Sequence, residues 1–200
     1  MKRINEVDEK TNFIGAWLIT NDKLFENIIN FFENNKFLQT QGRMDNGINL
    51  NEKNTTDMTI DPIDLKDQKY FMFKEYFDEL YKCYLDYKKQ WPFITENIKN
   101  LDIPSFNVQR YLSGEHFSKI HSERLSTSTS HRVFAWMTYL NDLDKDSGGH
   151  TNFHHFGIKI KPQKGKTLIW PAEWTHAHSG EILKFGKKYI ITGWMCFPFN

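Results

Sequence analysis

The second half of this chain consists of short runs in which apolar side chains recur at every second position. After Pro104, Phe106, Val108 and Leu112 alternate with more polar neighbours, and turns marked by Gly or Pro separate the runs. This period is typical of strands that bury one face. Several such strands predict a mostly β fold, a jelly roll or double-stranded β-helix. The expected strands are residues 106–112, 133–140, 156–160, 167–170, 174–179 and 189–197.

Two amphipathic helices are predicted in the first half, after a first strand at residues 13–19. One runs to Asn35 and is capped by Asn21 or Asp22. The other covers residues 67–91 and ends at a proline. Both are expected to flank the jelly roll by packing on its outer face. Their apolar stripes are formed by Leu24, Phe25, Ile28, Ile29 and Phe32, and by Tyr70, Phe73, Phe77, Leu80, Tyr81, Tyr84 and Leu85.

The length of 200 residues suits a single domain spanning residues 1–200. We expect residues 1–100 to form a helical support and a lid loop, and residues 101–200 to form the jelly-roll core. The polar segment 39–60 is expected to be a long loop with at most one short strand, and this loop would overhang a site. A second polar segment, residues 126–130, is expected to frame the same site.

Charge and composition argue against several classes of partner. The net charge is +1, with acidic and basic residues interleaved, so nucleic-acid binding is not indicated. No apolar run is long enough to cross a bilayer, and residues 1–5 do not resemble a secretory signal. The two cysteines, Cys83 and Cys196, are expected to be free thiols in a cytoplasmic protein that does not bind membranes.

All eight histidines lie between His116 and His178, so a metal site would belong to the second half. His121 and Glu123 are two residues apart and therefore point to the same side of a strand. A second imidazole, from His176 or His178, would arrive from another strand. Two imidazoles and one carboxylate can bind one face of Fe(II) and leave positions open on the other. An isolated H-x-E pair is more commonly a solvated part of a strand. The accompanying motifs therefore decide whether this pair belongs to a metal site.

One lysine of the Lys187-Lys188 pair is expected to point into the barrel. Lys188, Ile190 and Thr192 share one side of the last predicted strand, and Lys187 lies on the other. An inward ammonium on a long side chain can pair with a carboxylate deep in the barrel. Such a half-buried ion pair is stronger than an exposed one.

A set of further motifs accompanies these residues. They are Tyr111, Tyr139-Leu140-Asn141-Asp142, Ser147-Gly148-Gly149-His150-Thr151-Asn152-Phe153, Lys161-Pro162-Gln163-Lys164-Gly165, Trp170-Pro171, His178-Ser179-Gly180, Gly186-Lys187-Lys188-Tyr189 and Trp194. Together they resemble the Fe(II)/2-oxoglutarate-dependent dioxygenases, in particular the prolyl 4-hydroxylase and lysyl hydroxylase branch. The resemblance covers about residues 107–197.

The resemblance implies a set of metal ligands. His121 and Glu123 stand where the family has its H-x-D pair, with Glu in place of the usual Asp. His178 stands at the distal metal histidine, because lysyl hydroxylases show a similar T-H-x-H-x-G string in which the second His is the ligand. His176 is the alternative ligand and otherwise a pocket residue near the metal.

The resemblance also implies a cosubstrate site. Lys188 follows ten residues after His178, the spacing at which the family often places the residue that holds the far carboxylate of 2-oxoglutarate. Tyr111 stands where the family commonly has a tyrosine that helps to bind the cosubstrate. Thr192, on the same side of the strand as Lys188, is placed with them.

The implied function is hydroxylation of a C–H bond, in a prolyl or other residue of a peptide or in a small molecule. Fe(II), 2-oxoglutarate and dioxygen are the implied cofactors and reactants, with ascorbate as a further one. Two alternatives remain open. Jelly rolls also serve as metal- or ligand-binding modules without turnover. A zinc-dependent enzyme could use the same residues, whereas the spacing of His150, His154 and His155 does not match a zinc motif.

Overall fold

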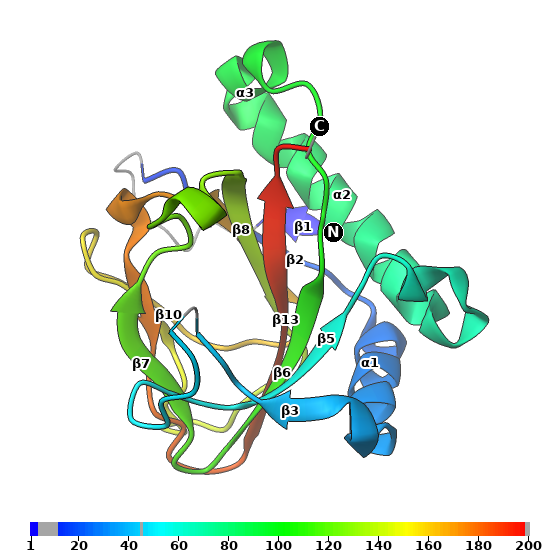
Figure 1. Cartoon of the computed structure of the whole chain (residues 1–200), viewed down its shortest axis with the longest axis vertical. Helices are drawn as coiled ribbons and strands as arrows, with labels where there is room; N and C mark the ends of the chain where they lie inside the picture. Colours follow the sequence, from blue (N-terminus) through cyan, green and yellow to red (C-terminus); the bar gives the residue numbers. More distant parts are fainter. Residues whose placement is uncertain (4–11, 45, 199–200) are drawn as a thin grey trace.

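The structure is a computed structural model that describes residues 1–3, 12–44 and 46–198. The prediction that residues 1–5 do not form a secretory signal falls partly on residues 4 and 5, which lie outside that description. Two β-sheets face each other, and the helices cover the outer face of the larger one (Figure 1). Every pair of neighbouring strands in the described residues is antiparallel. The expected jelly roll flanked by helices is confirmed.

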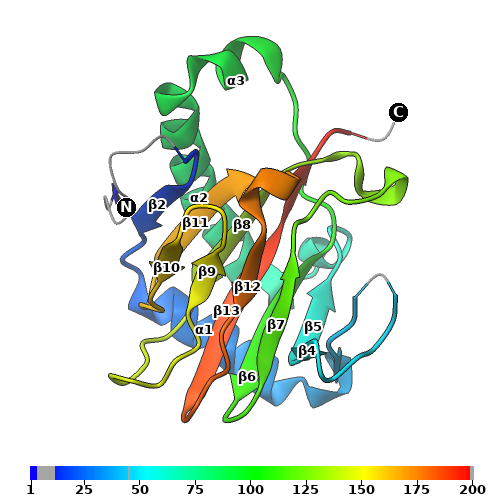
Figure 2. The same ribbon diagram turned by 90° about the vertical axis from the view of Figure 1, so that its left-hand side faces the viewer.

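The two sheets differ in size, and each combines strands that are distant in the chain. In spatial order, the larger sheet contains β1 (Lys2–Arg3), β2 (Gly15–Leu18), β11 (Lys166–Pro171), β8 (Arg132–Tyr139), β13 (Lys187–Cys196), β6 (Phe106–Leu112), β5 (Thr56–Ile60) and β3 (Gln39–Gln41). The smaller sheet contains β10 (Ile158–Ile160), β9 (Thr151–Phe153), β12 (His178–Gly180), β7 (His116–His121) and β4 (Lys53–Asn54). Figure 2 shows β7 and β12 side by side in this smaller sheet.

The helices follow in chain order. They are α1 (Asp22–Asn34), α2 (Phe71–Gln90) and α3 (Pro92–Asn97), with short 3-10 helices at Lys36–Leu38, Asp64–Lys66, Gln68–Tyr70, Thr127–Thr129 and Trp174–His176. None of the helices in the described ranges is long and apolar enough to cross a membrane. The predicted N-terminus of α1 is confirmed, because the side chain of Asn21 accepts a hydrogen bond from the Leu24 backbone N–H at 3.2 Å.

Two hydrophobic cores hold these layers together. One lies between the helices and the larger sheet, where Phe25 and Phe32 of α1 and Phe73 of α2 join Trp136 and Ile191. The other lies between the sheets, and its members include Tyr139, Phe153, Leu168, Trp170 and Ile190. Trp170 and Ile190 of this second core also line a cavity between the two sheets.

The buried face of α2 differs from the predicted stripe. Tyr81 is 57% exposed and Leu85 is 36% exposed, so their predicted places in the core are wrong. Tyr76, Cys83 and Tyr87 are buried instead, in line with Phe73 and Leu80 at three- and four-residue steps. The buried stripe of α2 is therefore rotated by about one residue from the predicted stripe. Tyrosines lie on both faces of the helix, so the apolar pattern alone did not distinguish the two faces. The proline after α2 also begins α3, which the sequence did not predict.

Residues 39–60 are more regular than the predicted loop. β3 and β5 pair with each other, and β5 continues the larger sheet beside β6. β4 pairs with β7 in the smaller sheet. The described part of residues 39–60 therefore contains three strands, and the first hundred residues contribute strands to both sheets. The polar composition concealed these strands, because one of their faces lines a polar cavity rather than an apolar core.

Two predicted strands are shorter than expected. Within residues 156–160 only β10 is a strand, because Gly157 adopts a φ of +65° in the turn before it. Within residues 174–179 a 3-10 turn covers Trp174–His176, and β12 begins only at His178. His176 and His178 therefore do not lie on one face of a single strand, as the sequence had suggested.

The packing of α2 can be tested with two phenylalanines of the same helix. Phe73 is fully buried, whereas Phe71 is 62% exposed. Phe73→Ala should lower the free energy of unfolding by about 3–5 kcal/mol, because it leaves a cavity in the core. Phe71→Ala should change it by less than about 0.5 kcal/mol. Denaturant unfolding measures both, and equal losses would contradict the observed orientation of α2.

Candidate metal centre

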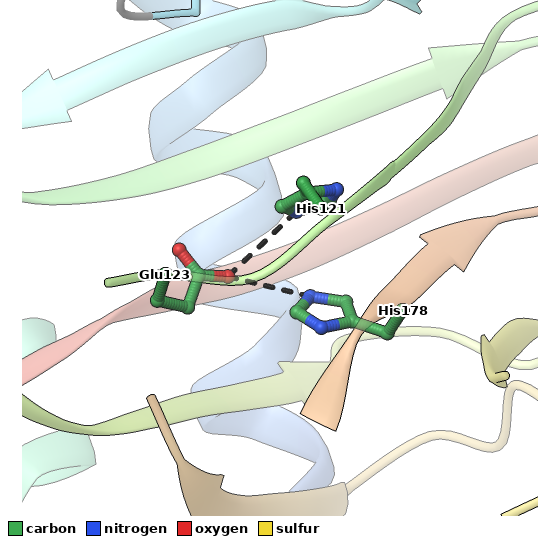
Figure 3. Close-up of side chains that lie close together, drawn as sticks. All are labelled: His121, Glu123 and His178. Atoms are coloured by element: carbon green, nitrogen blue, oxygen red, sulfur yellow. Dashed lines mark ion pairs between the residues drawn. The ribbon is translucent and has the colours of Figure 1, made fainter. Parts of the chain in front are cut away.

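Neighbouring strands of the smaller sheet bring His121, Glu123 and His178 together. His121 is the last residue of β7 and pairs with His178, the first residue of β12. Glu123 follows β7 by two residues, and its backbone N–H donates to Ala172 O at 3.2 Å. The three side chains converge from these two strands (Figure 3). No other group of three or more His, Cys, Asp or Glu ligand atoms gathers in residues 1–3, 12–44 and 46–198.

Both histidines direct one nitrogen at the same carboxylate oxygen. His178 Nε2 lies 3.3 Å from Glu123 Oε1, and His121 Nε2 lies 3.7 Å from it. The opposite nitrogens are held by the backbone, because His121 Nδ1 lies 2.9 Å from Lys119 O and His178 Nδ1 lies 2.9 Å from His176 O. A carbonyl only accepts, so each Nδ1 carries the proton and each Nε2 presents a lone pair.

The charge states of the group suit a metal cation. Burial lowers the pKa of His121 to about 4, with a further contribution from His178, so this imidazole is neutral near pH 7. Burial raises the pKa of Glu123, but contact with the imidazoles of His178 and His121 and the indole N–H of Trp194 outweighs it and brings that pKa to about 2. The site therefore offers a neutral imidazole at His121 and a charged carboxylate at Glu123, the forms in which these side chains bind metals.

These residues fit Fe(II). Ligand atoms that bind one metal at about 2.1 Å and at right angles lie about 3.0 Å apart, close to the separations between these three side chains. Two imidazoles and a carboxylate on one side of a cavity are the donor set of non-haem iron oxygenases. The other side of the cavity leaves room for further ligands.

His176 lies apart from this group. Its ring is 3% exposed, with Nε2 2.8 Å from Asn12 O and Nδ1 3.0 Å from Thr175 Oγ1. Its backbone carbonyl, rather than its ring, serves the site by accepting from His178 Nδ1. The geometry thus brings His178, and not His176, to His121 and Glu123.

The cavity beside the metal group measures about 530 Å³ and contains the predicted cosubstrate residues. Lys188 is 3% exposed, and its Nζ donates to Gly149 O at 3.0 Å and lies 4.0 Å from the centre of the Tyr111 ring. Lys187 is exposed, so Lys188 is the lysine of the pair that points inward. Thr192 also lines the cavity, and its hydroxyl donates to Trp136 O at 2.8 Å.

Burial lowers the pKa of Lys188 to about 7, and the charge of Glu181 opposes that shift only in part. No carboxylate forms an ion pair with Lys188 among the contacts of the described residues, so its ammonium faces the cavity uncompensated. An anion that entered this part of the cavity would stabilise the charged form.

A chain of hydrogen-bonded polar side chains on the cavity wall was not predicted from the sequence. Tyr111 OH donates to Gln109 Oε1 at 2.9 Å, and Gln109 Nε2 donates to Asp57 Oδ2 at 3.2 Å. Asp57 in turn forms a buried ion pair with Lys53, with Nζ and Oδ2 2.7 Å apart. The first two residues could have been linked from the alternation in β6. Asp57 could not, because its segment was predicted as a loop, although it pairs with Gln109 across β5 and β6.

Two further residues contact Glu123, and Arg132 also forms an ion pair with it, with Nη1 4.0 Å from Oε2. Trp194 Nε1 donates to Glu123 Oε2 at 2.7 Å, and Arg132 Nη1 donates to Glu123 O at 3.0 Å. Trp194 lies two positions beyond Thr192 on the same face of β13, and that spacing was the available signal.

The three histidines considered for a zinc site do not gather. His150 Nδ1 lies 2.7 Å from Glu181 Oε2, and His154 Nε2 lies 2.9 Å from Ser179 Oγ. The ring of His155 contacts Trp174. They are peripheral residues with separate partners.

Comparison with known proteins gives one family match. Residues 106–196 match the model of the 2OG-Fe(II) oxygenase superfamily. None of the curated protein sequences compared with this chain matches it.

Solved structures with the same fold include several prolyl hydroxylases. A viral collagen prolyl hydroxylase from Paramecium Bursaria Chlorella virus-1, in complex with 2OG, has a TM-score of 0.69 and 16% identity, over 92% of this chain and 96% of that one. A Pseudomonas putida prolyl-4-hydroxylase has a TM-score of 0.71 and 14% identity, over 94% and 95%. A Trichoplax adhaerens prolyl hydroxylase, in complex with a hypoxia inducible factor peptide fragment, has a TM-score of 0.71 and 16% identity, over 93% of this chain and 84% of that one. At these identities the likeness establishes the fold.

The two candidate histidines can be separated by equivalent substitutions. His178→Gln should weaken Fe(II) binding by more than the roughly 10–100-fold that follows loss of an outer partner of a metal ligand. His176→Gln should leave the affinity within a few fold, although loss of a buried hydrogen bond lowers stability. Anaerobic titration with Fe(II) measures both variants. Equal Fe(II) affinities in the wild type and His178→Gln would show that His178 is not a ligand.

Proposed function

We propose that this chain, whose residues 106–196 belong to the 2OG-Fe(II) oxygenase superfamily, hydroxylates a C–H bond in a prolyl or other residue of a peptide. The chain is a 2-oxoglutarate-dependent dioxygenase, and its cofactors are Fe(II) and 2-oxoglutarate. Together they supply the oxidation: one oxygen atom enters the substrate, and 2-oxoglutarate becomes succinate and CO2. The observation that carries the proposal is one cavity that joins the His121, Glu123 and His178 group to the buried cation of Lys188.

His121, Glu123 and His178 would hold the iron. The backbone carbonyls behind both imidazoles fix their orientation, so the lone pairs stay directed at the cavity without a change of tautomer. Glu123 contributes the single negative charge of the group. Three protein ligands gather there among the described residues, so positions on the cavity side remain for the cosubstrate and dioxygen.

Lys188 would anchor the far carboxylate of 2-oxoglutarate. Its ammonium is buried, so a carboxylate beside it gains more Coulomb energy than at the surface. The Tyr111 ring, 4.0 Å from Nζ, supports the charged form through its π face and closes one side of the pocket. Thr192 would border the same carboxylate from the floor of the cavity.

A peptide is the substrate class that the cavity mouth favours. Its lining includes Thr40, Gln41 and Asn46 before β4, and Thr129 from the segment at residues 126–130. Such side chains can donate to and accept from a peptide backbone. The likeness of fold to prolyl hydroxylases, one of them in complex with a peptide fragment, supports the same choice.

Turnover tests the proposal directly. The purified chain with Fe(II), 2-oxoglutarate and dioxygen should form succinate, and a suitable proline-containing peptide should accelerate this and gain one oxygen atom per succinate. Mass spectrometry of the peptide and assay of succinate provide the measurement. Succinate coupled to oxidation of a small molecule, with no peptide oxidised in a broad peptide library, would contradict the peptide substrate. No succinate from iron-loaded protein under any of these conditions would contradict the oxygenase activity itself.

The cation at Lys188 gives 2-oxoglutarate binding a defined pH dependence. The pKa of Lys188 is about 7, so the ammonium that the carboxylate needs is present below pH 7 and lost above it. Affinity should be nearly constant below pH 7 and fall by up to about tenfold per pH unit above it, with uptake of a proton on binding. Titration calorimetry of Mn(II)-loaded protein in two buffers measures both effects.

Lys188→Arg provides the matched control, since a guanidinium stays charged throughout this range. The variant should bind 2-oxoglutarate with little change in affinity between pH 7 and pH 9. The assignment of Lys188 would be refuted if the wild type and this variant showed the same pH dependence.

A further inference from the structure

The two carboxylate oxygens of Glu123 have separate partners. Both histidines approach Oε1, with His178 Nε2 at 3.3 Å and His121 Nε2 at 3.7 Å. Oε2 instead accepts the indole N–H of Trp194 at 2.7 Å. One oxygen is thus directed at the metal group, and the other is held on the opposite side of the carboxylate.

Arg132 supports this arrangement from the neighbouring strand. Its guanidinium carbon lies 3.8 Å from the centre of the Trp194 ring, and its Nη1 donates to the backbone carbonyl of Glu123 at 3.0 Å. The cation over the ring draws electron density from the indole and makes its N–H a stronger donor. The same arginine therefore fixes the backbone of Glu123 and reinforces the contact to its carboxylate.

A glutamate at this position needs such support. It has one more rotatable bond than aspartate, so its carboxylate can swing or turn unless both ends are held. The side chain is only 13% exposed, and an oxygen left without a donor there would lose a charge-assisted hydrogen bond.

We propose that Trp194, backed by Arg132, is a positioning residue that fixes the longer side chain of Glu123 so that Oε1 alone is presented to the metal. In this way a glutamate occupies the place of the shorter aspartate. The inference rests on the proposed metal site. It adds that the indole N–H and the extra methylene of Glu123 form a matched pair, whose effects on metal binding depend on each other.

Trp194→Phe removes the N–H and keeps most of the ring. Anaerobic binding of Fe(II) and Co(II) is the measurement, with thermal unfolding as the check on folding. The affinity of the variant for either ion should be at least about tenfold lower. The visible absorption bands of bound Co(II) should also shift, because the carboxylate is no longer fixed. Trp174→Phe is the control: Trp174 is 64% exposed and its ring contacts His155 rather than the metal group, so neither affinity nor spectrum should change.

The decisive comparison repeats Trp194→Phe in the Glu123→Asp background. The aspartate is shorter by about 1.5 Å, so its carboxylate cannot reach both the metal and the indole. Glu123→Asp should still bind Co(II), and the added Trp194→Phe should then cost less than about twofold in affinity. An equal loss in both backgrounds, or no loss in the wild-type background, would overturn the pairing of Trp194 with Glu123. Wild-type protein that binds neither ion would instead overturn the metal site itself, and the pairing with it.

Discussion

The site depends on the pairing of β7 with β12, which sets His121 opposite His178. Each ring then donates its Nδ1 proton to a carbonyl two residues earlier in its own segment, Lys119 O or His176 O. Both Nε2 atoms consequently face one carboxylate oxygen. A shift of one residue in this register would turn one imidazole to the other face of the sheet, and the three side chains would no longer meet.

The same fold places a buried cation in the cavity beside this group. Lys188 lies on β13 in the larger sheet, whereas the metal group lies on the smaller sheet, so the space between the sheets joins the two. An unpaired buried ammonium is unfavourable for stability, and its lowered pKa records that cost. Such a group is typical of a ligand site, where a bound anion restores the charge balance.

Much of this arrangement could be predicted from the sequence because it follows from alternation along strands. Period two predicted that one lysine of the Lys187-Lys188 pair points inward and that His121 and Glu123 share a side. The ten-residue spacing from His178, implied by the family resemblance, selected Lys188. Alternation could not separate His176 from His178, because it treats both as parts of one strand. In the structure a 3-10 turn ends at His176, and β12 begins only at His178. Lys53 and Asp57 were missed because β4 has only two residues, and only Met58 and Ile60 mark the apolar face of β5. The contact between Trp194 and Glu123 joins residues far apart in the chain, and only the three-dimensional fold reveals it.

The most direct test of the account is the visible spectrum of the protein mixed with Fe(II) and 2-oxoglutarate without oxygen. If the metal group and Lys188 act on one bound cosubstrate, a weak metal-to-ligand charge-transfer band should appear only when both are present. Protein that binds Fe(II) yet shows no such band at saturating 2-oxoglutarate would contradict the account.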